Sequence, residues 1–152
     1  MRTVGLILGR FCPVHRGHQH VIERALGEMD RVVVALFDDP SCPTAPTVRA
    51  GWLRRLYPTL DVITVEDLRG DDDAVWKRYH EVFRRGIGER ITHVFSSEDY
   101  GARIAWRLRA VNVVVDRERT SVPVSATQIR TDPARFKEFL EPFVYDHLVG
   151  EP

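Results

Sequence analysis

The chain has 152 residues, a length that suits one domain with a sizeable hydrophobic core. Twenty-two basic residues balance twenty-two acidic ones, which argues against a nucleic-acid-binding protein that works by bulk positive charge. No apolar run reaches the roughly 20 residues that span a bilayer, and the short N-terminal run lacks a signal-peptide cleavage site. We therefore expect a single cytoplasmic domain over residues 1–152, without a nucleic-acid or membrane partner, in which Cys12 and Cys42 are reduced thiols.

Short β-branched, apolar runs alternate with segments of helical periodicity along the chain. The runs predict strands at 3–9, 31–38, 61–67, 92–98 and 111–116. The segments between them predict helices at 17–29, 47–57, 72–87 and about 100–109. Because alternation with nearly continuous apolar strands is typical of parallel sheets covered on both faces, the predicted fold class is a doubly wound, five-stranded, Rossmann-like α/β domain.

Short helices are expected to follow the last strand. Asp132 and Pro133 have the residue types of a helix cap and first turn, and Glu141 and Pro142 repeat this pattern. Gly150 is a plausible end for the second of these helices.

The first strand is followed by the segment GRFCPVHRGH, residues 9–18, which leads directly into the first helix. Ligands of doubly wound domains bind beyond the carboxyl ends of the strands, so this segment is a candidate site. A zinc site lacks partner ligands at suitable spacing. Packed or capping histidines remain an alternative, but His15, Gly17 and His18 at a helix N-terminus favour a phosphate site.

A second candidate segment is PVSATQIRTDP, residues 123–133. Ser125 and Gln128 fit a capping box, which explains Ser125 without any ligand. Arg130 is expected near a helix start, where a cation opposes the helix dipole unless an anion lies between them. Together with the Ser125 and Thr127 hydroxyls, Arg130 therefore predicts a polyphosphate site.

The two segments together resemble the signatures of the nucleotidylyltransferase superfamily, Gly-x-Phe-x-Pro-x-His-x-Gly-His and Ile-Ser-x-Thr-x-x-Arg. The stretches HVFSSEDYG and VVVDRERTSVPVSATQIRTDPARFKEFLEP are similar to the adenylyltransferase part of NadR-like nicotinamide mononucleotide adenylyltransferases. The resemblance covers nearly the whole chain and is loose between about 38 and 90. It implies transfer of AMP from ATP to nicotinamide mononucleotide, giving NAD and pyrophosphate, with Mg²⁺ arriving together with ATP.

The resemblance also implies residue roles. It implies that His15, His18 and Arg130 stabilise the transition state. ATP would be bound by Gly9, Arg10, Phe11, Gly17, Ser125, Thr127 and Arg130. The other substrate would meet Trp76, Ser96, Ser97 and Arg49, although a packed core tryptophan fits the position of Trp76 equally well.

Two departures from the family pattern limit what is carried over. Gly51 stands where members of the family often have arginine, which puts contacts from that helix in doubt. No Walker-type phosphate loop is present, so kinase and repressor activities are not carried over. Asp71, Asp72 or Asp73 could hold a metal ion, but a solvated helix start is the favoured interpretation, and no residue is assigned as a direct metal ligand.

Alternative functions remain open at this stage. The same motifs serve transferases that act on phosphopantetheine, flavin mononucleotide, nicotinate mononucleotide or glycerol 3-phosphate. A nucleotide-binding sensor without turnover is another possibility. The expected partners are the small molecules ATP and nicotinamide mononucleotide, and a homo-oligomer is compatible with the sequence.

Overall fold

The computed structural model describes residues 1–116 and 123–150, and it is built around a five-stranded parallel sheet. The strands are β1 (Val4–Gly9), β2 (Arg31–Asp38), β3 (Asp61–Glu66), β4 (His93–Ser96) and β5 (Val111–Val114), in the spatial order β3-β2-β1-β4-β5. The connecting helices are α1 (Arg16–Glu28), α2 (Pro46–Leu56), α3 (Asp73–Ile87) and α4 (Tyr100–Leu108). The predicted fold class is confirmed.

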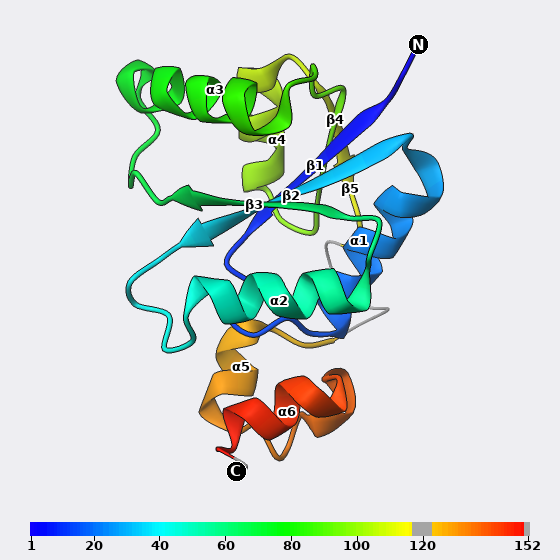
Figure 1. Cartoon of the computed structure of the whole chain (residues 1–152), viewed down its shortest axis with the longest axis vertical. Coiled ribbons are helices and arrows are strands. Elements are labelled where there is room, and N and C mark those ends of the chain that lie inside the picture. Colours follow the sequence, from blue (N-terminus) through cyan, green and yellow to red (C-terminus); the bar gives the residue numbers. More distant parts are fainter. Residues whose placement is uncertain (117–122, 151–152) are drawn as a thin grey trace.

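Helices cover both faces of the sheet because the central strands are apolar on both sides. In β2, every residue from Val32 to Leu36 is buried. Residues Val32, Val34 and Leu36 pack with α1 and α2, whereas Val33 and Ala35 pack with α3 and α4. Figure 1 shows α3 and α4 on one side of the sheet and α1 and α2 on the other.

The order of the strands places a topological switch at β1. The chain winds from β1 outward through β2 to β3, then returns to place β4 on the other side of β1. Helices that leave β1 and β4 therefore diverge to opposite faces, which opens a crevice beyond the carboxyl ends of these strands. This is where the sequence predicted a ligand.

The C-terminal segment adds small helices to the face formed by α1 and α2. Figure 1 shows helix α5 (Ala126–Thr131) and helix α6 (Pro142–Leu148) on the side of the sheet where α2 lies. They contribute Ile129 and Val144 to that core. Helix α6 begins after Glu141 as predicted, and Gly150 has the positive φ of a helix end. The helix predicted to begin at Asp132 is wrong.

Asp132 is instead the C-terminal cap of α5. Its Oδ1 accepts a hydrogen bond of 3.3 Å from the Arg135 backbone N–H, which builds a turn. The chain then forms only the 3₁₀ turn Lys137–Phe139. Asp-Pro is a turn signal as well as a helix-start signal, so the local sequence allowed both outcomes. Within residues 1–116 and 123–150, no helix is long and apolar enough to cross a membrane.

Candidate active site

A cavity of about 480 Å³ lies beyond the carboxyl ends of β1, β2, β3 and β4. All the sequence-predicted site residues line it except Arg49 and Trp76. These lining residues are Gly9, Arg10, Phe11, His15, Gly17, His18, Ser96, Ser97, Ser125, Thr127 and Arg130. The fold thus brings the two motif segments, more than 100 positions apart, to opposite sides of one cavity.

The two histidines of the first segment cap the N-terminus of α1. Nδ1 of His15 accepts a hydrogen bond of 3.0 Å from the Gly17 backbone N–H, and Nδ1 of His18 accepts one of 3.2 Å from the His15 backbone N–H. The rings stack with their centroids 3.8 Å apart. The capping role that the sequence left open is therefore real, and it exists beside any role in ligand binding.

This capping geometry fixes the proton positions in both rings. A ring nitrogen that accepts a hydrogen bond from a backbone N–H carries no proton, so the neutral tautomer is protonated at Nε2. Each ring thus has an Nε2–H group, which can donate to an anion. Helix N-termini favour anions for the same electrostatic reason, so the arrangement suits a phosphate group in the cavity.

Phe11 lines the cavity and packs against the ring of His18. Its ring centroid lies 4.7 Å from that of His18, and the residue is 1% exposed. A Cβ at position 9 would lie 3.1 Å from the Phe11 ring, so glycine at this position allows the ring to pack against the end of β1. Phe11 itself has a φ of 52°, in the left-handed region that only a few non-glycine residues occupy.

The second motif segment forms α5, and its cap is the predicted one. The Ser125 hydroxyl accepts from the Gln128 N–H, and the Ser125 N–H donates to the Gln128 side chain at 2.9 Å. The expectation that Arg130 lies near a helix start is wrong, because α5 has only 6 residues and Arg130 falls in its last turn. There the helix dipole favours a cation.

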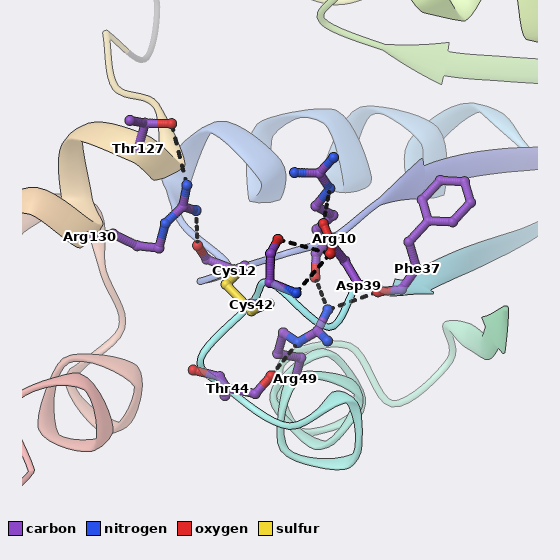
Figure 2. Close-up of a disulfide and its surroundings, with 10 residues drawn as sticks. Arg10, Cys12, Phe37, Asp39, Cys42, Thr44, Arg49, Thr127 and Arg130 are labelled. Carbon is purple, nitrogen blue, oxygen red and sulfur yellow. Dashed lines mark hydrogen bonds and ion pairs between the residues drawn. A yellow bond between two sulfur atoms is a disulfide. The ribbon is translucent and has the colours of Figure 1, made fainter. Parts of the chain in front are cut away.

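Arg130 instead joins the two motif segments. Its Nη1 donates a hydrogen bond of 2.6 Å to the Cys12 carbonyl in the β1–α1 loop, and its Nη2 lies 3.4 Å from the Thr127 hydroxyl (Figure 2). The guanidinium is thus held at the cavity wall by groups from both sides. Because the carbonyl compensates only part of the positive charge, the arginine keeps the capacity to bind an anion.

The two cysteines form a disulfide, so the expectation of reduced thiols is wrong for this structure. Cys12 in the β1–α1 loop is bonded to Cys42 in the β2–α2 loop, with their Cα atoms 6.2 Å apart (Figure 2). A spacing of 30 residues matches no motif, which is why the sequence alone could not predict the pairing. The bond fixes the loop that carries the cavity-lining residues to its neighbour.

Arg49 ties the same two loops together from within the core. It is fully buried, and it donates to the carbonyls of Thr44 at 2.9 Å, Arg10 at 2.7 Å and Phe37 at 3.0 Å (Figure 2). Its Nη2 has no hydrogen-bond partner within residues 1–116 and 123–150. Desolvation lowers the pKa of this guanidinium from its usual value. The structure thus places Arg49 behind the cavity wall.

Trp76 is a residue of α3 whose side chain packs in the core with residues of α4, outside the cavity. It is 6% exposed, and its Nε1–H donates a hydrogen bond of 2.7 Å to Asp71. The Tyr79 ring packs against it at 5.4 Å, and the Arg107 guanidinium lies 5.9 Å from its ring centre. These contacts are those of a packed core tryptophan, the alternative that its position on the helix stripe had left open.

The β4–α4 loop forms the remaining wall. Ser96 is buried and its hydroxyl donates to the Glu98 carbonyl at 3.0 Å. Glycine at position 101 allows this contact, since a Cβ there would lie 2.0 Å from the Ser96 hydroxyl. The sequence did not single out Tyr100, which lines the cavity and donates to the Leu8 carbonyl at 3.0 Å. Tyr100 could have been predicted as a cavity residue from its position at the junction between the fourth strand and the helix that follows it.

No group of three or more His, Cys, Asp or Glu side chains that could hold a metal ion occurs in the described part of the chain. The cavity instead gathers cationic and donor groups of Arg10, His15, His18 and Arg130. The fold and this donor set define the chain as a doubly wound domain with a site suited to a phosphate-bearing ligand.

Comparison with known proteins gives the family. The model of the cytidylyltransferase-like family matches residues 6–132, and the chain belongs to this family. Among curated proteins it is 26% identical over 159 residues to the trifunctional NAD biosynthesis/regulator protein NadR of Escherichia coli. That match covers 91% of this chain and 39% of NadR, so the chain spans about two-fifths of the length of this relative.

Another relative has a similar length to this chain. A probable nicotinate-nucleotide adenylyltransferase of a Nitratiruptor species is 22% identical over 172 residues, with 96% of both chains covered. Among solved structures, NadR in complex with NAD and AMP-PNP superposes with a TM-score of 0.70 at 22% identity. This superposition covers 97% of this chain and 47% of that one, and it shows that the two share a fold.

Proposed function

We propose that the protein is an adenylyltransferase that transfers AMP from ATP to nicotinamide mononucleotide, giving NAD and pyrophosphate. The observation that carries the proposal is the meeting of the two motif segments at one cavity. The chain's similarity to NadR and to a nicotinate-nucleotide adenylyltransferase supports the same reaction class. We also propose that residues 1–152 form a single domain and that the protein is cytoplasmic, a compartment in which the Cys12–Cys42 disulfide is an exception.

The chemistry of this reaction fits the side chains at the cavity. The attacking group is the phosphate of the mononucleotide, which is already an anion at neutral pH, so no general base is required. The bond between the α- and β-phosphates of ATP breaks, and pyrophosphate leaves as a stable anion. The protein therefore has to align the reactants and stabilise the added negative charge.

Each cavity residue then has a defined task. The Nε2–H groups of His15 and His18 donate to oxygens of the α-phosphate, where charge increases in the transition state. Arg130, with the Ser125 and Thr127 hydroxyls, binds the β- and γ-phosphates from the opposite side. Arg10 binds the phosphates at the mouth of the cavity, and Mg²⁺ enters with ATP, whose charge it partly neutralises.

The acid form of the mononucleotide is the second candidate acceptor. It is favoured by one observation, the match to a nicotinate-nucleotide adenylyltransferase over 96% of both chains. The two acceptors differ only in a carboxamide or a carboxylate on the pyridine ring. The proposed acceptor is the amide, and the acid is the first competitor to test.

The direct test is an assay with purified protein, ATP, Mg²⁺ and each acceptor separately. We expect NAD from nicotinamide mononucleotide, detected by a coupled dehydrogenase, and a lower kcat/KM with nicotinate mononucleotide. If nicotinamide mononucleotide gives no product but nicotinate mononucleotide, phosphopantetheine or flavin mononucleotide does, the proposed acceptor is wrong and the proposed adenylyl transfer still stands. ATP binding without product from any acceptor would instead identify a nucleotide-binding sensor.

A further inference from the structure

Asp39 is a buried carboxylate that does not line the cavity but contacts Arg10 at the start of the β1–α1 loop, which does line it. It follows β2 directly, and its side chain is 4% exposed. Oδ1 accepts from the Ser41 N–H at 2.9 Å and from the Ser41 hydroxyl at 2.8 Å. Oδ2 lies 3.0 Å from the Nε of Arg10. Figure 2 marks this ion pair with a dashed line.

The charge state of Asp39 is consistent with this pairing. The Ser41 backbone N–H and hydroxyl, followed by the charges of Arg10 and Arg69, hold the pKa of Asp39 below its usual value. Arg69 is the more distant cation, with its Nη2 3.8 Å from Oδ1. A buried carboxylate is stable only when such partners compensate for lost solvation, and Arg10 is the nearest cation.

Arg10 gains a defined orientation from this contact. Its side chain is 59% exposed at the cavity wall, where a long flexible arginine would otherwise sample several rotamers. Asp39 contacts Nε, and among the described residues Asp39 is the ion-pair partner of Arg10. The backbone of Arg10 is fixed as well, because its carbonyl accepts from Arg49 at 2.7 Å.

We propose that Asp39 is a positioning residue that holds Arg10 with its terminal amino groups toward the phosphates of a bound nucleotide. The proposal rests on the proposed function, since it takes the anion in the cavity to be the phosphate chain of ATP. Asp39 acts through Arg10 and does not touch the ligand. Holding the guanidinium in place before binding reduces the entropy that binding would otherwise cost.

The test is a double-mutant cycle on ATP binding, measured by calorimetry in the absence of an acceptor. Asp39→Asn keeps the shape of the side chain and an oxygen for Ser41, but it removes the charge that holds Arg10. We expect Asp39→Asn to weaken ATP binding about tenfold, and Arg10→Gln to weaken it at least as much. In the Arg10→Gln background, Asp39→Asn should have no further effect.

Matched controls separate positioning from loop damage. Asp38→Asn removes the same charge one residue earlier, at an exposed position without an ion pair in the described part of the chain, and should leave the affinity within twofold of the wild type. Adenosine has no phosphates, so its affinity should not respond to Asp39→Asn. Arg10→Gln alters an exposed side chain, so it reports on the contact even if Asp39→Asn fails to fold.

Two results would overturn the proposal. An equal loss of ATP affinity from Asp39→Asn with and without Arg10 would show that Asp39 only builds the Ser41 turn. An Arg10→Gln variant with wild-type affinity would show that the contact has no role in ATP binding. Because binding is measured without turnover, a protein that binds ATP but makes no NAD would contradict the proposed function and leave this inference standing.

Discussion

The two motif segments that meet at the cavity are held in place very differently. In the β1–α1 segment, residues 9–18, the side chains of Phe11, Cys12, Val14 and His15 are all at most 5% exposed. In the α5 segment, residues 123–133, Val124 and Ile129 are the buried anchors, while Thr127 and Arg130 are exposed. The cavity wall formed by the β1–α1 segment is therefore part of the hydrophobic core. The wall formed by the α5 segment is attached to the core by two buried side chains and is otherwise on the surface.

The number of cross-links differs in the same way. The β1–α1 segment is tied to the β2–α2 loop by a disulfide, by Arg49 and by the Asp39–Arg10 ion pair (Figure 2). The α5 segment is joined to the β1–α1 segment through Arg130. We infer that the β1–α1 segment, residues 9–18, is a rigid segment that presents preorganised donors. The α5 segment is an adjustable segment, which contributes charge on a short helix that can adjust to the ligand.

The largest effect is expected at His18, in the rigid segment. His18→Ala should lower turnover on the order of 10²- to 10³-fold, the usual loss for one donor that stabilises charge in the transition state. A loss of at least about tenfold is required by the proposed role. His18→Asn is the matched variant, because its side-chain oxygen can still accept from the His15 N–H and keep the cap. Steady-state kinetics and thermal unfolding of both variants measure the two roles separately.

We expect the asparagine variant to keep the unfolding temperature near that of the wild type and to lose turnover like the alanine variant. Wild-type turnover in His18→Asn would show that the ring does no more than cap α1. It would also remove the argument that the rigid segment carries the transition-state contacts.

The next effect concerns the disulfide and is one of stability. Cys42→Ser opens a loop of 30 residues, and the chain-entropy relation then gives a loss of about 3 to 4 kcal/mol in the free energy of unfolding. For a domain of this size the midpoint should fall by roughly 10 °C. A dithiol reductant should lower the midpoint of the wild type by a similar amount, measured by circular dichroism.

The Cys42→Ser variant is its own control for the reductant, which should have no effect on it. A wild-type midpoint that does not respond to full reduction, verified by thiol titration, would contradict the view that the disulfide stabilises the rigid segment. In that case Arg49 and the core packing of Phe11 would be sufficient to hold the loop.

The sequence predicted the sheet well because burial on both faces leaves a clear signal. The strand expected at 31–38 is β2 without correction, and the helix expected at 72–87 is α3 within one residue. The site prediction worked for a related reason. Parallel strands all end at the same edge of a sheet, so segments that follow different strands must meet there.

What the sequence missed depends on contacts between distant segments. The pairing of Cys12 with Cys42 and the burial of Arg49 behind the β1–α1 loop follow from how two loops pack, which periodicity does not encode. Trp76 lies on the apolar stripe of its helix, and that position fits a packed core tryptophan and a substrate-binding tryptophan equally well. Helical periodicity alone therefore could not distinguish the two roles. The position of Arg130, by contrast, had a local signal: Ser125 caps α5 and Pro133 disfavours helix at the residue before it, which leaves only 6 helical residues and places Arg130 in the last turn.

The smallest effect is expected at Ser125, in the adjustable segment. Ser125→Ala removes the cap of α5 and should lower the free energy of unfolding by about 1 kcal/mol. Its ATP affinity should fall about two- to fivefold, which corresponds to a contact worth less than about 1 kcal/mol. Ser125→Asn restores a capping oxygen and should recover stability but not affinity, because the hydroxyl that we propose binds the phosphates is still missing. Full recovery of both in the asparagine variant would assign Ser125 to the cap alone and leave Arg130 as the principal phosphate contact of α5.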